Sequence, residues 1–520
     1  MRKVPGLDPL DRDWSNAVPN NDPQTAARGA AIEGVLELHP AVRKAALVDE
    51  GGDGLVAFVV PDEAYMDEVM GCGLAGSTVL GKWRKTFDLS QLSKAAAAAP
   101  VGFNTIGWNS SYTRGTLPLE AMQEWVDNTV DDILRLSPKA LCEIGCGTGM
   151  LVMRIAPRCD RYVAVDFSPV VLKRLREQLQ KVPTVAARVE LMERRADNLD
   201  GLGQNSFDAV VLNSVVQYFP NAAYLTKVLE NAINIVRPGG HVYVGDVRSL
   251  QLLQVFDTSV ELFQAADELS AGELRDRIRR RAEREPELVL SPAYFLSLQN
   301  KFPKISRVDI WPLRGRADNE MTRFRYAAIL HIGHDKATVF DGEFFDWTEH
   351  RWGLDEIRSA LRQHSNEAFG VKGIRNARIN KDLAATAILD AADAALTAGE
   401  LRHTIEQSPN EGIHPQSLFD LEKEGLGFAV FLSWAACRRD GSYDAFFVPA
   451  RLLQGGTLPA IAWPKPDASE LARLANAPGQ FKMRNDLTAQ LMAHCIQNLP
   501  QESMPREIIL VDTLERASWR

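Results

Sequence analysis

The chain has 520 residues, of which 45% are hydrophobic and 24% charged, and its formal net charge is −9. These ordinary values exclude wholesale disorder, collagen-like repeats and a disulfide scaffold, and the acidic balance argues against a general nucleic-acid binder. No apolar run approaches the ~20 residues that span a bilayer, and the N-terminus has no apolar signal region. The six scattered cysteines include no CxxC pair. We therefore expect a reduced, cytoplasmic chain without a metal site, with roughly three domains and no membrane or nucleic-acid partner.

The N-terminal part predicts a small α/β piece followed by a mixed region. Residues 1–23 predict an irregular arm. Helical spacing and then two short apolar runs follow at 27–38, 45–48 and 54–60. The stretch 62–117 contains an alanine run at 95–99, and residues 118–136 predict a helix.

From 140 to 250 predicted strands alternate with predicted helices. The strands are expected at 140–144, 161–167, 188–197, 207–215 and 241–247. The helices are expected at 149–156, 168–180 and 222–236, the last closed by Arg-Pro-Gly-Gly. This alternation predicts a doubly wound, mostly parallel sheet.

The remainder predicts a helical insert and a second α/β region. Residues 252–301 are helical and charged, and acidic residues interleave with the arginines of 275–287, which favours a solvated helix face over a nucleic-acid patch. A late strand is expected at 324–332, a boundary at 333–341 and a second α/β region at 342–450. A linker at 455–469 precedes a tail with a helix and a strand at 507–514.

A glycine-rich motif carries the strongest chemical signal. Glu143-Ile144-Gly145-Cys146-Gly147-Thr148-Gly149 follows an apolar strand and opens a helix, where glycines let a backbone approach a ligand closely. Asp166 ends the next strand about 20 residues on, where a ribose diol is hydrogen-bonded. Asp197 follows the third strand, in place for an adenine amino group, and Asn213 ends the fourth.

The acidic residue before the first glycine selects among ligands. Glu143 disfavours a pyrophosphate, because like charges would face each other, and suits a cationic or zwitterionic ligand. The pattern therefore favours S-adenosylmethionine as cofactor. The alternatives are a dinucleotide enzyme and a plain Rossmann domain.

A wider set of segments resembles the methyltransferase domains embedded in nonribosomal peptide synthetases. The similarity covers roughly residues 78 to 450 and rests on FNTIGWNSSYTRGTLPLEAMQEWVDNTVDDIL, LCEIGCGTGM, RYVAVDFSP, ADN, VVLNSVVQYFP, RPGGHVYVGDVRSLQLL, ELVLSPAYF, RGRADNEMTRFRY and RNARI. Such domains transfer a methyl group from S-adenosylmethionine, usually to the α-amine of a carrier-bound aminoacyl group and in a minority to oxygen or carbon. That family usually has Asp after RFRY, where this chain has Ala327.

The two ends resemble the small C-terminal subdomain of an adenylation domain. Asp22-Pro-Gln24, with Asp22 matching the hinge acid, Arg28-Gly29, Ile32-Glu33 and HPAVRKAALV match its start, and LPQESMPREIILVDTL matches its close. The large adenylation core is absent, and Leu514-Glu515-Arg516-Ala517 stands near the place of the NGK lysine, so no amino-acid activation is expected. We expect four segments: 1–75 and 466–520 as the split subdomain, 76–335 as the Rossmann-like methyltransferase core, and 336–465 as its second α/β lobe.

The expected site residues follow the ends of the strands. The cofactor set is Glu143, Gly145, Cys146, Gly147, Gly149, Asp166, Phe167, Ala196, Asp197, Asn198, Asn213, Ser214 and Tyr112. The catalytic set, which orients the acceptor, is Asn213, Gln217, Tyr218, Asp246 and Arg248. Tyr218 is alternatively a packed aromatic, and Arg248 an ion-pair partner of Asp246.

Two further groups surround this site in the prediction. The loop from Trp108 to Tyr112 is expected to fold over the cofactor as a lid, or else to be a structural cap. The charged residues before the late strand line the acceptor side or form a surface salt-bridge set; they are Arg314, Arg316, Glu320 and Arg323.

Three functions remain open at this point. The first is N-methylation of an aminoacyl or peptidyl group on a carrier protein supplied in trans. The second is O- or C-methylation of a carrier-bound or free small molecule. The third is a non-catalytic interaction subunit, which the cofactor motif disfavours because a scaffold needs none of it.

Overall fold

The computed structural model divides the chain into two compact units, residues 1–79 with 478–520, and residues 80–477. It describes residues 23–49, 55–62, 64–66, 100–333, 342–364, 367–453 and 480–511, with short pieces at 81, 84, 88, 91, 340, 461, 474–476, 478 and 514. The expected alanine run lies wholly, and the expected linker, arm and boundary largely, outside these residues. Asp22 also lies outside them.

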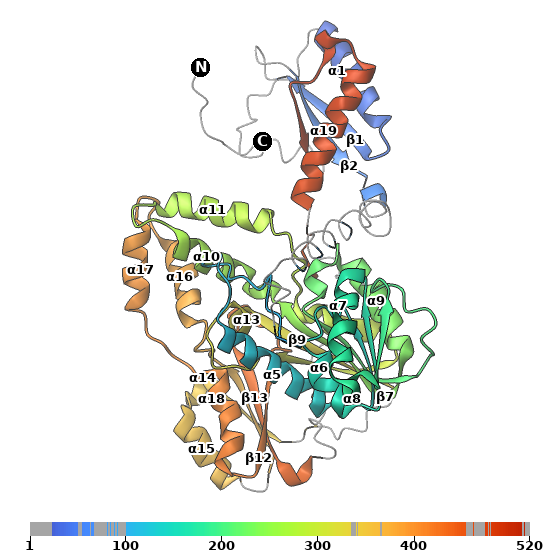
Figure 1. Cartoon of the computed structure of the whole chain (residues 1–520). Helices are drawn as coiled ribbons and strands as arrows, with labels where there is room; N and C mark the ends of the chain where they lie inside the picture. Colours follow the sequence, from blue (N-terminus) through green and yellow to red (C-terminus); the bar gives the residue numbers. More distant parts are fainter. Residues whose placement is uncertain are drawn as a thin grey trace. The chain divides into compact units, whose positions relative to one another are not determined.

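The smaller unit joins segments from the two ends of the chain in one sheet. Its strands β1 (Val42–Asp49), β2 (Leu55–Pro61) and β14 (Glu507–Leu510) lie in the order β1-β2-β14, with β1 antiparallel and β14 parallel to β2. Helices α1 (Pro23–Glu37) and α19 (Gln480–Asn498) pack on it (Figure 1). Its core includes Ile32, Leu36, Leu491 and Cys495.

The larger unit is built on a seven-stranded sheet. Its strands are β3 (Ala140–Ile144), β4 (Arg161–Asp166), β5 (Val189–Glu193), β6 (Phe207–Asn213), β7 (Val236–Arg248), β8 (Ile305–Pro312) and β9 (Arg325–Ile332). The order is β5-β4-β3-β6-β7-β9-β8; the first five are parallel, and β9 is antiparallel to both β7 and β8. This confirms the predicted doubly wound, mostly parallel α/β fold.

Helices cover both faces of this sheet, as an all-buried parallel sheet requires. One face packs against α5 (Leu119–Arg135), α6 (Val152–Ile155) and α7 (Pro169–Gln180), and the short α8 (Pro183–Ala186) follows α7. The other face packs against α9 (Ala222–Ile235) and α12 (Pro292–Lys301). The carboxyl ends of β3, β4, β6 and β7 therefore meet at one edge, where ligands of such sheets bind.

A helical cluster stands beside the sheet in Figure 1. It combines α10 (Leu253–Gln264) and α11 (Ala271–Glu283) with α16 (Asn380–Ala391) and α17 (Ala398–Glu406). Leu274, Leu389 and Leu401 lie in its shared apolar core. The second α/β region thus contributes helices to the insert of the core.

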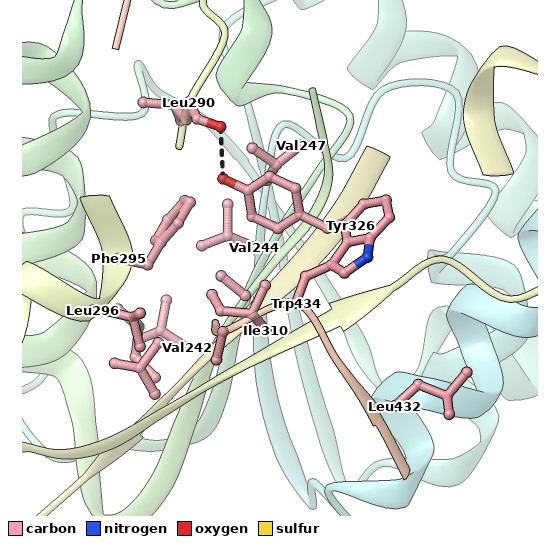
Figure 2. Packing of buried hydrophobic residues seen from close by; sticks show 14 of the residues in the cluster. Val242, Val244, Val247, Leu290, Phe295, Leu296, Ile310, Tyr326, Leu432 and Trp434 are labelled. Carbon is pink, nitrogen blue, oxygen red and sulfur yellow. Dashed lines mark hydrogen bonds between the residues drawn. The ribbon is translucent and has the colours of Figure 1, made fainter. Parts of the chain in front are cut away.

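The second lobe has its own four-stranded sheet in the order β10-β11-β13-β12. Its strands are β10 (Glu343–Asp346), β11 (Phe369–Ile374), β12 (Phe428–Ser433) and β13 (Tyr443–Pro449), and its helices are α14 (Trp347–His350), α15 (Leu354–Gln363) and α18 (Pro415–Asp420). The backbone N–H of Trp434 donates to Ile310 O at 3.0 Å. Figure 2 shows Trp434 beside Tyr326 and near Ile310, and Leu432 of β12 belongs to the same apolar cluster, so one apolar core runs through both sheets.

Some predicted boundaries differ from the observed ones. The Arg-Pro-Gly-Gly segment lies inside β7, which begins at Val236 and has a register shift beside Ala209. Gly239 has a positive φ of 84° there, which lets the strand absorb the turn. The strand β8 was not predicted; Pro303 and Lys304 separate it from α12 and hide its start.

Among the described residues, no helix is long and apolar enough to cross a membrane.

The hydrogen bond drawn in Figure 2 gives a stability prediction. The buried Tyr326 hydroxyl donates to Leu290 O at 3.0 Å. Tyr326→Phe removes this bond and leaves that carbonyl only the N–H of Leu250. We expect the free energy of unfolding to fall by about 1 kcal/mol, measured by urea denaturation followed by tryptophan fluorescence. An unchanged midpoint would show that the bond is not formed.

Candidate active site

The glycine motif forms a backbone cradle at the end of β3. Gly145, Gly147 and Gly149 all have positive φ, of 76°, 50° and 83°. A Cβ on Gly145 would lie 2.4 Å from Val215 Cγ2, whereas a Cβ on Gly147 would enter open space. The glycines thus serve two purposes. Gly145 permits close packing, and Gly147 leaves backbone exposed to a ligand.

A cavity of about 720 Å³ opens above this cradle. The predicted residues that line it are Glu143, Gly145, Cys146, Gly147, Asp166, Phe167, Ala196, Asn213, Ser214, Gln217, Tyr218 and Arg248. Its wall also contains Trp108, Asn109, Ser111, Phe256, Arg281, Arg284, Glu285, Glu287, Glu320 and Arg325. The sheet edge therefore brings most of the predicted residues to one space.

Two buried carboxyls mark the end of the cavity nearest the cradle. Burial raises the pKa of Glu143 to about 7, against the opposing effect of a hydrogen bond from Tyr162 Oη at 2.7 Å. Burial raises the pKa of Asp166 to about 6, although the backbone N–H groups of Ser168 and Gly147 each donate to it at 2.9 Å. A cation or hydroxyl donors arriving here would stabilise the ionised forms.

Besides Tyr112, which is described below, three members of the predicted cofactor set lie outside the cavity wall. A Cβ on Gly149 would meet Leu175 Cδ1 at 2.4 Å, so this glycine serves helix packing. The Asp197 carboxylate receives two hydrogen bonds of 3.0 Å from Arg195, and Asn198 Oδ1 accepts from Arg194 at 3.3 Å. The predicted roles of all three remain predictions.

The catalytic edge contains two strained residues that hold each other. Ser214 and Asp246 have positive φ of 56° and 61°, a conformation that costs a non-glycine residue about 1 kcal/mol or more. Ser214 Oγ donates to Asp246 Oδ2 at 2.5 Å, and Arg325 Nη1 donates to the same oxygen at 2.7 Å. Burial raises the pKa of Asp246, but two short donors favour its carboxylate, and the facing charge keeps the pKa of Arg325 above its usual value despite burial. We take the pair as ionised.

The predicted alternative that Arg248 pairs with Asp246 is wrong. Asp246 pairs with Arg325, because its left-handed backbone interrupts the alternation of side chains along β7. Arg248 instead binds Glu285 at 2.6 and 2.9 Å and Glu287 at 2.9 Å. Asp246 itself does not line the cavity and acts there through Ser214.

Glu285 and Glu287 belong to a segment, residues 285–290, that crosses the carboxyl edge of the sheet. The Leu288 N–H donates to Gln217 O at 2.7 Å and the Leu290 N–H to Arg248 O at 3.0 Å. Sequence reasoning placed both carboxylates on a charged, solvated stretch. The available signal was Pro286, which ends the helical pattern before the apolar Leu288.

The loop at 108–112, expected as a lid, forms the roof of the cavity and is hydrogen-bonded to α10 and α13 (Glu320–Phe324). Trp108, Asn109 and Ser111 line the cavity, and Glu320, at the start of α13, accepts from the Ser111 N–H at 2.8 Å and from its hydroxyl at 3.1 Å. Gln264 Nε2 on α10 donates to the carbonyl of Ser111 at 2.7 Å.

Tyr112 is an anchor of this roof and does not line the cavity. Its hydroxyl lies 3.1 Å from Ser259 Oγ, and the Arg323 guanidinium lies 5.3 Å from its ring centre. Asp382, on α16, accepts from Ser259 at 2.6 Å and pairs with Arg323 at 3.0 Å. The second α/β region thereby fixes the roof of the cavity.

The charged residues before β9 divide between the two predicted roles. Glu320 lines the cavity. Arg314 pairs with Asp132 at 3.6 Å, Arg316 with Asp420 at 2.6 Å, and Arg323 with Asp382. Ala327 is fully buried in the sheet. Among the described residues, no group of three or more His, Cys, Asp or Glu side chains is placed to hold a metal ion.

Comparison with known proteins adds a family assignment to this geometry. Residues 142–242 match a family model described as a methyltransferase domain. The chain is 35% identical over 507 residues to chondramide synthase cmdD of Chondromyces crocatus, covering 94% of the chain and 13% of that protein. It is 27% identical over 528 residues to the beauvericin nonribosomal cyclodepsipeptide synthetase of Beauveria bassiana, covering 93% of the chain and 16% of that protein.

Among solved structures, the methyltransferase domain of bacterial CtHen1 has 18% identity and a TM-score of 0.30, covering 41% of this chain and 100% of that one. That likeness is too low to bear on the reaction. The chain spans only a small part of each synthetase that it matches.

The buried carboxyl of Glu143 gives a pH-dependent prediction. Its pKa is higher in the folded than in the unfolded state, so stability falls as pH rises from about 4.5 to 7. Glu143→Gln keeps an acceptor for Tyr162 and removes this penalty. We expect the free energy of unfolding of the variant, relative to that of the unchanged chain, to rise by up to about 3 kcal/mol from pH 5 to pH 8. Urea unfolding without ligand measures this difference.

The matched control for that experiment is Glu190→Gln, whose exposed carboxylate pairs with Arg161. This substitution should change the free energy of unfolding by the same amount at pH 5 and at pH 8. A difference between Glu143→Gln and the unchanged chain that does not vary with pH would contradict the raised pKa.

The anchor role of Tyr112 gives a second prediction. Tyr112→Phe loses the contact with Ser259 but keeps the ring beside Arg323. We expect about 1 kcal/mol lower stability and less than about a threefold change in the dissociation constant of S-adenosylmethionine, measured by calorimetry. A loss of affinity beyond tenfold would place the hydroxyl at the cofactor instead.

Proposed function

We propose that this chain is a methyltransferase of the kind associated with nonribosomal peptide synthetases, and that it N-methylates the α-amine of an aminoacyl or peptidyl group attached to a carrier protein. The methyl donor in this proposal is S-adenosylmethionine. The observation that carries it is the cradle end of the cavity, where exposed glycine backbone lies between two buried carboxyls, Glu143 and Asp166.

The residues present fit this donor. Its ribose offers two hydroxyl donors to the Asp166 carboxylate, and its positive charges suit Glu143. The open space above Gly147 gives room that a side chain would fill. We assign Gly145, Cys146, Phe167 and Ala196 to the remaining wall of this end. When bound, the donor supplies an activated methyl group on sulfur.

The acceptor end favours nitrogen. Asn213 Oδ1 and Gln217 Oε1 are buried acceptor atoms that find no donor among the described residues. An amine offers two N–H donors to such a pair, whereas a hydroxyl offers one. We propose that these oxygens orient the amine with its lone pair toward the methyl carbon, and that Tyr218 and Arg248 shape the surrounding wall.

The transfer is an in-line displacement in this scheme. The N–C bond forms as the S–C bond breaks, the electron pair stays on sulfur, and the methylated ammonium then releases a proton to solvent. A thioester-bound α-amine is less basic than a lysine amine, so orientation suffices without a dedicated base.

The smaller unit has no activating role in this proposal. Near the place of the adenylation lysine the chain has Leu514-Glu515-Arg516-Ala517, so we propose that these residues activate no amino acid. In this proposal the carrier that presents the aminoacyl group lies outside residues 1–520.

A calorimetric titration tests the cofactor seat. Asp166→Asn keeps the size of the side chain but replaces a carboxylate oxygen by an amide donor. We expect S-adenosylmethionine affinity to fall at least tenfold, about 1.4 kcal/mol or more. Asp355→Asn is the matched control, because its exposed carboxylate pairs with Arg358 and does not line the cavity, and it should bind normally. Unchanged affinity in Asp166→Asn would refute the ribose contact.

Intact-mass measurement of aminoacyl carrier proteins tests the acceptor. The proposal expects the carrier arm to gain one or more methyl groups in the presence of S-adenosylmethionine. Methylation of free amino acids alone would favour a small-molecule enzyme, and absence of S-adenosylmethionine binding would favour a non-catalytic subunit.

A further inference from the structure

Helix α11 presents an arginine stripe that the site described above leaves unexplained. Its apolar residues, Ala271, Leu274 and Ile278, are buried in the helical cluster. Arg277, Arg280, Arg281 and Arg284 recur three, four and seven residues apart, so they share one stripe of the helix. Arg277 and Arg280 are exposed.

The stripe leads from solvent to the cavity. Arg281 and Arg284, at its C-terminal end, line the cavity wall. Arg281 is held there by Asp257 at 2.8 Å, and its guanidinium lies 5.6 Å from the centre of the Phe256 ring. Figure 1 shows α11 along the outside of the helical cluster.

The charge of the stripe is opposite to that of the chain as a whole. The chain carries a formal net charge of −9, yet two arginines of this stripe line its cavity and the other two continue the stripe into solvent. Of the carboxylates of the same helix, Asp276 and Glu283 fall on the neighbouring stripe by the same helical period. Glu273 stands one turn before Arg277, at the end of the stripe farthest from the cavity. A merely solubilising face has no reason to end at a cavity.

We infer that this arginine stripe docks an acidic face of the carrier protein, so that the phosphate of its prosthetic arm passes Arg284 and the arm enters the cavity. The inference rests on the proposed function, because it presumes a carrier-bound substrate. Exposed arginines act over about a Debye length, ~8 Å at physiological salt, so they steer and hold a partner that carries opposite charge. Arginine also binds phosphate bidentately.

Reversing the charge at the solvent end of the stripe tests this. The double variant Arg277→Glu with Arg280→Glu changes two exposed residues that do not line the cavity. Its probes are carrier proteins encoded beside the gene, each loaded with a panel of aminoacyl groups, and the matching aminoacyl pantetheine thioesters. We expect KM for the loaded carrier to rise about tenfold or more, with the thioester reaction unchanged.

Arg279→Glu is the matched control, since it is an exposed arginine of the same helix on another face. It should leave KM for the carrier within about twofold. Salt supplies a second readout. Raising the ionic strength should raise the unchanged chain's KM for the carrier toward the value of the double variant.

The outcomes separate docking from function. Unchanged KM in the double variant, or equal losses on carrier and thioester, would overturn the docking surface while leaving the proposed function intact. If the unchanged chain methylates neither probe, the proposed function fails. Docking is then judged by the fluorescence anisotropy of labelled carrier protein alone. Equal binding by the unchanged chain and by the double variant would overturn the docking surface.

Discussion

A buried ion pair organises the catalytic edge. Arg325 of β9 reaches the Asp246 carboxylate of β7, and Ser214 after β6 donates to the same oxygen. Without these donors two left-handed backbones would have no compensation, and a buried charge would be unpaired, which costs several kcal/mol. The antiparallel strand β9 is therefore part of the site: it supplies the charge that lets β6 and β7 end in the shape that forms the cavity wall.

The second lobe and the insert have a comparable role at the roof. Asp382 on α16 holds Arg323 and Ser259, and these two groups hold Tyr112. Arg378, buried just before that helix, donates to the carbonyls of Leu313, after β8, and Thr322, in α13 with Glu320. The cavity thus has a wall set by the sheet and a roof set by elements about 270 residues away in the chain. A fixed roof suits a substrate that enters on an arm from one side.

Sequence reasoning found the sheet because buried parallel strands are short apolar runs separated by turn signals. It found the cradle, Glu143 and Asp166 because glycine spacing and strand ends are local features. It misjudged the partner of Arg248 because the positive φ of Asp246 has no sequence signal. It did not find Glu285 and Glu287 because they follow an arginine-rich helix, and it did not find the partner of the Tyr112 hydroxyl, Ser259, because that residue lies 147 residues away. What escaped was the long-range pairing of polar groups, which local patterns do not encode.

The central claim is that two buried amide oxygens, those of Asn213 and Gln217, present an amine to the methyl donor. The most direct measurement is fragmentation mass spectrometry of the aminoacyl arm released from a carrier protein after reaction with S-adenosylmethionine. The account predicts that the added methyl group stays with the α-nitrogen fragment. A methyl group found on a side-chain oxygen or carbon would contradict it.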